Sequence, residues 1–156
     1  MKRLVLDAGP LIALFSAKDD YHEQCKAGFG KLPGLFNEVL TPLPILFEVY
    51  KFIGREQSSK VAQDALAGIY EETLVVPLEM KTFQEIYSLV LQMPEWKGSL
   101  EDASVVITAQ QSEASVWTLD YRDLSWFKNL ELWTIREKLR KRSRCQVGNW
   151  RNWMWG

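Results

Sequence analysis

The sequence predicts a single α/β domain with a three-layer α/β/α architecture, in which helices cover both faces of a parallel sheet of four or five strands. Short apolar runs alternate with longer stretches of helical periodicity along the 156 residues, an order that is typical of parallel sheets. Apolar residues make up 47% of the chain and charged residues 25%, as in a globular domain able to bury its own core. We expect this domain to span residues 1–135, followed by a distinct segment over 136–156.

The first strand is predicted at 4–6, an apolar run short enough to be buried on both faces. Asp7 follows directly, and Gly9 and Pro10 then begin a helix with proline near its first turn. Ligands of open α/β sheets bind just beyond the carboxyl ends of the strands, so Asp7 stands where chemistry is expected. The alternative for Asp7 is a turn residue that bonds local backbone amides.

The second strand is predicted at 38–41, after a helix over 21–29 that Asp19 or Asp20 would cap. Thr41 is the expected N-cap of the next helix, with Pro42 at its first position.

Glu48 borders the apolar face of that next helix. The buried stripe is predicted at Ile45, Val49 and Phe52. A carboxylate beside an apolar row is costly unless it is paired or bound to a metal, although a salt bridge to Lys51 or Arg55 would also explain it.

The middle of the chain is predicted to be scaffold. Ser58 and Ser59 cap a packing helix, a third strand at 73–76 ends at Pro77, and an amphipathic helix over 83–91 stops by Pro94.

Two more carboxylates come from the last third of the domain. Asp102 lies in the first turn of a helix over 103–111, where its spacing from Ser99 also matches a capping box. A β-prone run at 116–120 ends in Asp120, which repeats the pattern of the first strand. A last strand is predicted at 132–135.

Charge is distributed unevenly. Residues 1–135 contain 12 basic and 19 acidic side chains, whereas residues 136–156 contain 7 basic and 1 acidic, for a net charge of -1. An acidic body argues against broad nucleic-acid binding by charge alone, so such a partner would need metal ions or the basic segment.

Cysteine and histidine are scarce. Cys25 and Cys145 have no paired spacing, and His22 is the one histidine, so neither a disulfide framework nor a zinc site is expected. A reducing, cytoplasmic setting fits best. Asp7 interrupts the first apolar run and no other run is long enough to cross a bilayer, so we expect no membrane segment.

Four carboxylates are candidates to meet at the carboxyl edge of the sheet: Asp7, Glu48, Asp102 and Asp120. Two unit charges ~4 Å apart repel by about 4 kcal/mol at an effective dielectric of about 20, so the group needs a counter-charge. Oxygen ligands with no nearby histidine or thiolate favour a hard ion, Mg²⁺ or Mn²⁺. Such a site suits hydrolysis of a phosphodiester by water, and the sequence has neither a GxxxxGK(S/T) loop nor a convincing Ser-His-Asp set.

These residues fall in four motifs along the first 135 residues. The motifs are Asp7–Leu14, Thr41–Glu48, Asp102–Val105 and Thr118–Asp123. In order and spacing they resemble the PIN-domain family of ribonucleases, which includes the VapC-type toxins of toxin–antitoxin pairs. The resemblance implies a PIN-like fold, Mg²⁺- or Mn²⁺-dependent endoribonuclease activity on RNA, a homodimer, and an antitoxin as a candidate partner.

The resemblance also implies roles for the acidic set. Asp7, Asp102 and Asp120 would coordinate the metal, and Glu48 would join them or orient the attacking water. Family members often carry Ser or Thr after the first aspartate, where Ala8 here lacks a hydroxyl, so the positioning of a water or a metal is expected to differ.

The end of the last motif holds three further candidates. Thr118 and Arg122 are candidates for substrate contact, and Asp123 for the acidic set. For Arg122 the preferred interpretation is an exposed ion pair. For Asp123 it is a residue that makes the turn around Tyr121 and Arg122.

The segment 136–156 lies outside the resemblance and has several interpretations. We expect a basic helix to about Arg144, followed by a Trp-rich end. RNA phosphates are one set of partners for its basic side chains, Arg140, Lys141, Arg142 and Arg144, with the tryptophans stacking on bases. A solvated helix with a frayed end, or tryptophans docked on another protomer, fits equally.

Two other functions compete with the nuclease. A catalytically silent PIN-like module would act by binding a protein. An aspartate-nucleophile phosphatase is disfavoured, because Gly9 stands where a DxD pair needs its second acid.

Overall fold

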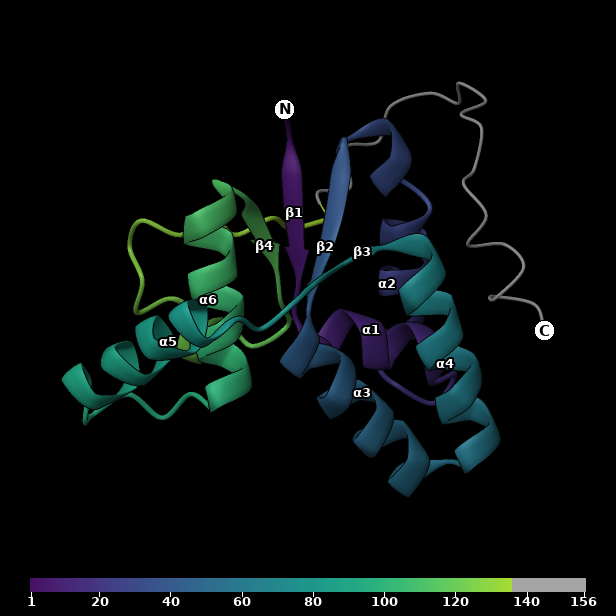
Figure 1. Cartoon of the computed structure of the whole chain (residues 1–156). Helices are drawn as coiled ribbons and strands as arrows, with labels where there is room; N and C mark the ends of the chain where they lie inside the picture. Colours follow the sequence, from purple (N-terminus) through teal and green to yellow (C-terminus); the bar gives the residue numbers. More distant parts are fainter. Residues whose placement is uncertain (136–156) are drawn as a thin grey trace.

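A computed structural model describes residues 1–135; the predicted basic helix and the four candidate RNA-binding side chains lie outside the described residues. The strands are β1 (Arg3–Leu6), β2 (Glu38–Pro42), β3 (Leu74–Val76) and β4 (Ser115–Trp117). The helices are α1 (Ala8–Phe15), α2 (His22–Phe29), α3 (Leu43–Glu56), α4 (Ser59–Glu72), α5 (Met80–Gln92), α6 (Leu100–Ser112) and α7 (Tyr121–Leu124), with a 3₁₀ turn at Leu32–Gly34 (Figure 1).

The four strands form one parallel sheet in the order β3-β2-β1-β4. The chain moves outward from β1 to β2 and β3, then returns through α5 and α6 to place β4 on the other side of β1. The strand order therefore reverses between β1 and β4, and in open α/β sheets ligands bind at the carboxyl ends of the strands at this point.

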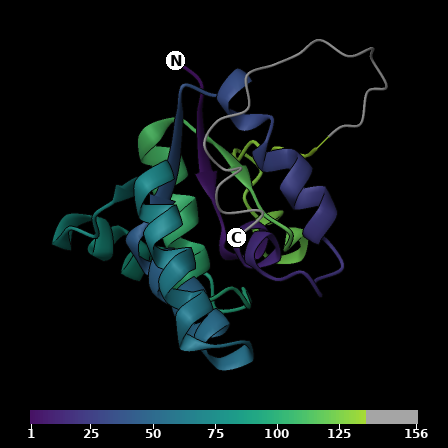
Figure 2. The same ribbon diagram turned by 90° about the vertical axis from the view of Figure 1, so that its right-hand side faces the viewer.

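Helices cover both faces of the sheet. In Figure 2, α2 lies on one side of the strands, and α4 and α6 lie on the other. The predicted α/β/α architecture with a parallel sheet is confirmed. None of the helices within residues 1–135 is long and apolar enough to cross a membrane.

The predicted fifth strand at 132–135 is wrong. Leu132 makes a single parallel bridge to Val116. The Val116 amide donates to the carbonyl of Glu131, and the Val116 carbonyl accepts from the amide of Trp133; both bonds are 2.8 Å long. The segment therefore only extends the edge of β4.

Two predicted helix caps are also wrong. Thr41 remains in β2, where its buried hydroxyl lies 2.9 Å from that of Thr73, and Pro42 takes the N-cap position of α3. Tyr21 precedes α2 without a side-chain cap, and Asp19 instead accepts from the amide of Tyr21 in the turn before the helix. Ser58 caps α4 as predicted.

The buried stripe of α3 includes two of its three predicted residues. Ile45 and Val49 are buried, but Phe52 is 37% exposed and Ile53 takes the inward position. A helix advances 100° per residue, so positions 49 and 53 share a face as well as 49 and 52 do. The packing of α3 against its neighbouring helices decides between them.

An aromatic cluster packs beneath β4. Trp117, fully buried, contacts Phe29 with ring centroids 4.7 Å apart and Trp133 at 4.8 Å, and Trp133 also meets Phe36. This cluster attaches the last described residues to the body of the domain.

We expect Gly28→Ala to lower the free energy of unfolding by about 1–3 kcal/mol, the usual cost of overpacking. A Cβ there would lie 2.6 Å from both Trp117 Cη2 and Ile135 Cδ1, and the indole has no room to move. The matched control is Gly34→Ala, where a Cβ meets nothing within 4 Å. Urea unfolding measures both; a Gly28→Ala protein at least as stable as the parent would contradict this packing.

Candidate active site

Asp7 lies at the carboxyl end of β1, beside the strand-order reversal. It is the N-cap of α1, and its Oδ1 accepts from the amide of Ala8 at 2.8 Å. The side chain is only 4% exposed. Asp7 therefore does bond a local backbone amide, as the turn-residue interpretation expects, but this bond uses only one of its two carboxylate oxygens.

Thr118 joins Asp7 to Asp120. Its buried hydroxyl donates to Oδ2 of Asp7 at 2.7 Å and accepts from the backbone amide of Asp120 at 2.9 Å. β4 ends at Trp117, so Asp120 lies three residues beyond the strand rather than at its end. A Cβ at Gly9 would lie 3.2 Å from Cβ of Leu119, so the glycine lets the start of α1 approach this segment closely.

Asp102 caps its own helix. Ser99 Oγ accepts from the amide of Asp102 at 3.1 Å, and Asp102 Oδ2 accepts from the amide of Ser99 at 2.8 Å, which completes the predicted capping box. Burial raises the pKa of Asp102, the bonds from Ser99 lower it, and the charges of Asp120 and Asp123 raise it. Asp102 therefore stabilises α6 and also lies within electrostatic range of the other acids.

Glu48 carries an unusual oxygen. Its Oε2 is buried and has no hydrogen-bond partner among the described residues. Arg55 pairs with Glu56 instead, and residues 1–135 show no ion pair between Glu48 and Lys51. Burial, followed by the charges of Asp7, Glu101 and Asp102, raises the pKa of Glu48 to about 7. The salt-bridge explanation of Glu48 is thus not supported.

Asp123 and Arg122 pair with each other. Both guanidinium contacts are 3.3 Å long, the arginine side chain is 79% exposed, and the Asp123 amide donates to Oδ1 of Asp120 at 3.4 Å. Asp120 is thus the N-cap of α7, and Asp123 lies within that helix, paired with Arg122. The candidate roles of these residues toward a metal or a substrate stay predictions.

The acidic side chains raise one another's pKa. Burial raises the pKa of Asp7 to about 6, although the bonds from Thr118 and Ala8 lower it, and the charges of Asp102 and Asp120 raise it further. Glu101 is not among the predicted site residues, and its charge raises the pKa of Glu48 in the same way. The one signal for Glu101 in the sequence is its position next to Asp102. That signal is weak, because a capping box explains an acidic residue at the start of this helix without any site.

The donor chemistry at this edge fits a hard divalent cation. Every candidate ligand is a carboxylate, each carboxylate has about four acceptor sites, and Glu48 holds a buried oxygen in need of a partner. Within residues 1–135, however, no three acidic, histidine or cysteine side chains are grouped tightly enough to hold an ion as they stand.

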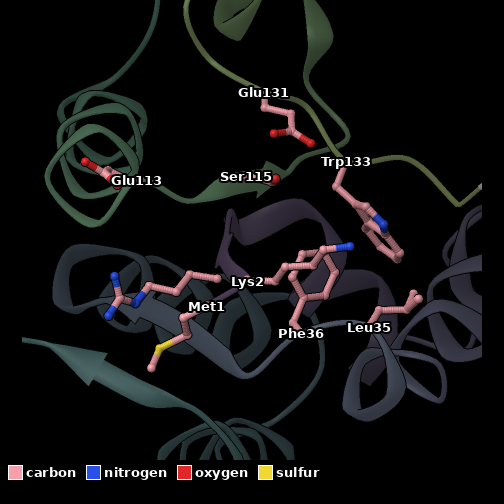
Figure 3. A pocket seen from close by; sticks show the side chains of 9 residues that line it. Met1, Lys2, Leu35, Phe36, Glu113, Ser115, Glu131 and Trp133 are labelled. Atoms are coloured by element: carbon pink, nitrogen blue, oxygen red, sulfur yellow. The ribbon is translucent and has the colours of Figure 1, made fainter.

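The hollow in Figure 3 lies elsewhere. It encloses about 260 Å³ and is lined by Lys2, Phe36, Glu131 and Trp133 among others, around the beginnings of β1 and β4. None of the predicted acidic site residues lines it.

We expect Thr118→Val to raise the pKa of Asp7 further and to lower stability, because the carboxylate loses a bond that favours its charged form. Thr118→Ser keeps the hydroxyl and is the matched control. Carbon-detected NMR titration of the Asp7 carboxyl measures the change. An unchanged pKa in the valine variant would show that the hydroxyl does not hold Asp7.

Fold and site together define a parallel α/β protein with an acidic site where the strand order reverses. A family model described as "PIN domain" matches residues 4–130. The chain therefore belongs to the PIN-domain family, a family of nucleases. No curated protein matches the sequence with significance.

Solved structures of toxins share this fold. VapC20 of Mycobacterium tuberculosis, described as a sarcin-ricin loop cleaving toxin, superposes with a TM-score of 0.72 at 17% identity, over 79% of this chain and 94% of that one. VapBC2 of Rickettsia felis, bound to a DNA fragment from its promoter, superposes with a TM-score of 0.64 at 13% identity, over 83% of this chain and 96% of that one. A toxin–antitoxin complex from Klebsiella pneumoniae superposes with a TM-score of 0.59 at 19% identity, over 81% of this chain and 94% of that one.

Proposed function

We propose that the chain is a divalent-metal-dependent endoribonuclease that hydrolyses phosphodiester bonds in RNA in the cytoplasm. The observation that carries the proposal is that one hydroxyl, that of Thr118, bonds both the carboxylate of Asp7 and the backbone amide of Asp120 where the strand order reverses. Two segments more than 100 residues apart in the chain thereby meet at one edge of the sheet, and each of them carries an aspartate.

The proposed ligands of the ion, Mg²⁺ or Mn²⁺, are Asp7, Asp102 and Asp120, with Glu48 as a fourth ligand or as the group that orients water. A bound ion would bring water toward hydroxide and neutralise charge on the phosphoryl oxygens. Thr118 holds one oxygen of Asp7 in place, and the helix start at Ser99 favours the ionised form of Asp102. Glu48 lies close enough to the other acidic side chains for their charges to act on it, so it is the candidate to accept a proton from the water.

The partners proposed for the chain follow from the nature of its structural relatives. VapC20 is described as cleaving the sarcin-ricin loop, and other relatives are complexes of a toxin with its antitoxin. We include in the proposal an RNA substrate, an antitoxin and a homodimer. A small neighbouring open reading frame whose product binds the chain would support the toxin assignment.

The alternative is a catalytically silent module that acts by binding a protein. One observation favours it: the carboxylates of residues 1–135 do not converge tightly enough to hold an ion as they stand. Calorimetric titration separates the two functions, because a nuclease of this kind binds Mg²⁺ or Mn²⁺ with heat release or uptake at millimolar concentration. No detectable binding of either ion would favour the module.

The direct test is cleavage of end-labelled single-stranded RNA of mixed sequence by the purified full chain. We expect internal cuts with Mg²⁺ or Mn²⁺, no cuts after chelation by EDTA, and recovery on adding back the ion. Single-stranded DNA of the same sequence is incubated in parallel. Cutting that persists in EDTA would contradict the metal-dependent chemistry, and cutting of DNA alone would contradict the choice of RNA.

A further inference from the structure

We propose that Trp96, in the loop between α5 and α6, is a positioning residue of the acidic site, because its indole holds α7, and with it Asp120, beside the start of α6. Trp96 bonds no acidic side chain; its Nε1 donates to the backbone carbonyl of Asp123 at 2.8 Å. The consequence for catalysis rests on the proposed function, whereas the holding of α7 depends on no activity.

The helix α7 is too short to hold its own position. It spans only Tyr121–Leu124, and an isolated helix of fewer than about 12 residues is marginal in water. At its beginning, the amide of Asp120 donates to the hydroxyl of Thr118. At its end, the carbonyl of Asp123 is one of those that a helix leaves without an intrahelical partner, and it accepts from Trp96. Of these two bonds, only the second comes from a distant part of the chain.

The residue that Trp96 holds is bonded directly to Asp120. The amide of Asp123 donates to Oδ1 of Asp120 at 3.4 Å, while the carbonyl of Asp123 accepts from the indole. A shift of the Asp123 backbone would therefore free or move the Asp120 carboxylate. The charge of Asp120 acts on Asp102 at the start of α6, so these two carboxylates lie near each other. The bond from Trp96 thus bears on the distance between two proposed ligands of the ion.

The indole of Trp96 is itself held in one place. The side chain is 6% exposed and packs in a small core cluster with Ile86 and Ile107, from α5 and α6. Its ring meets that of Phe127, just beyond α7, edge-on with centroids 5.3 Å apart. A Cβ at Gly98 would overlap the indole, so the glycine lets the loop lie directly against the ring. Because the ring cannot turn without opening this packing, its N–H stays directed at one carbonyl.

The same ring also lies against the start of α6. Gly98 is followed by Ser99, the N-cap whose capping box contains Asp102. One side chain therefore contacts both the loop that leads to Asp102 and the helix that Asp120 caps. A buried indole N–H generally finds a partner, so simple core packing also accounts for the bond. A variant that removes the N–H and keeps an aromatic ring separates packing from positioning.

Hydrogen exchange of the full chain without metal tests the holding of α7. In ¹⁵N NMR spectra of the parent, the indole N–H of Trp96 should exchange about 100-fold more slowly than that of Trp126, which is 49% exposed. In Trp96→Phe, the amides of Asp123 and Ser125 should exchange about tenfold faster, the usual worth of one hydrogen bond. The matched control is Trp133→Phe, because the Trp133 indole donates no hydrogen bond to any described residue. It should leave both amides unchanged.

Two results of the exchange measurements would overturn the proposal. One is a Trp96 indole that exchanges as fast as that of Trp126, and the other is parental exchange at Asp123 and Ser125 in the phenylalanine variant. The second variant is Gly98→Ala, which keeps the indole but displaces it and should also speed exchange in α7. It serves the same purpose if Trp96→Phe does not fold.

Calorimetric titration of the full chain with Mn²⁺ tests the effect on the site. Groups that orient metal ligands commonly contribute a factor of 10 to 100, so we expect Trp96→Phe to weaken Mn²⁺ binding about tenfold and Trp133→Phe to leave it unchanged. In cleavage assays, the Mn²⁺ concentration for half the maximal rate should rise by the same factor. The KM for RNA should change less than about twofold, because Trp96 is too buried to contact RNA. All measurements are made well below the unfolding temperature of each variant.

These results separate failure of the positioning role from failure of the proposed function. If the parent binds Mn²⁺ and cuts RNA, parental Mn²⁺ affinity in Trp96→Phe would overturn the positioning role and leave the function standing. A parent that binds no Mn²⁺ would remove the proposed function. Hydrogen exchange would then still decide whether Trp96 holds α7.

Discussion

Replacing Asp7 by asparagine should reduce RNA cleavage by about 1,000-fold while the protein becomes more stable in the absence of divalent cations. The loss of activity follows from removing a charge at the centre of the proposed metal site, where one group commonly contributes a factor of this size. The gain in stability follows from burial, because Asp7 is 4% exposed and its pKa is raised to about 6 mainly by desolvation. Asparagine removes the buried charge and retains an oxygen that accepts from Ala8.

The matched control is Asp20→Asn, which removes an exposed carboxylate that caps no helix. RNA cleavage is measured with Mg²⁺, and thermal unfolding is measured in EDTA, on all three proteins. An Asp7→Asn protein that unfolds far below the parent would instead assign Asp7 a purely structural role, and one that cleaves at the parental rate would remove it from the active site.

The second large effect is on the pH dependence of stability without divalent cations. The pKa of Asp7 is 3.8 in a model peptide and about 6 in the fold, and that of Glu48 is 4.5 and about 7. A carboxyl whose pKa is raised by folding binds its proton more tightly in the folded state. Its contribution to stability is complete below the unfolded pKa and is lost as the pH rises through the folded one. Stability should therefore fall between about pH 4 and pH 7, by ~3 kcal/mol from Asp7 alone.

Urea unfolding at pH 4, 5, 6 and 7 in EDTA measures this fall. The double variant with Asp7→Asn and Glu48→Gln should flatten it, since neither replacement titrates. Of these four pH values, Mg²⁺ should stabilise the parent most at pH 7, where Asp7 and Glu48 are ionised to the greatest extent, and it should stabilise the double variant much less. A parent protein whose stability rises steadily across this range would show that the acidic side chains are not buried together.

Local sequence signals predicted much of the fold and part of the site. The apolar run before Asp7, the serine cap of α4 and the Ser99–Asp102 capping box all act within a few residues, and each occurs where expected. The predictions that failed were those that neighbouring elements decide. Thr41 has the residue type of an N-cap, but its hydroxyl bonds that of Thr73, just before β3. Phe52 is partly exposed, and Ile53 is buried in its place.

The sequence by itself determined the order of the four strands and of the main helices between them, because hydrophobic periodicity and caps are properties of contiguous segments. Only the tertiary structure decided that β4 pairs with β1, that the hydroxyl of Thr118 joins Asp7 to Asp120, and that one oxygen of Glu48 is buried without a partner. These features depend on distances between residues far apart in the chain. Such distances are set by how the sheet and helices pack, and no local pattern contains them.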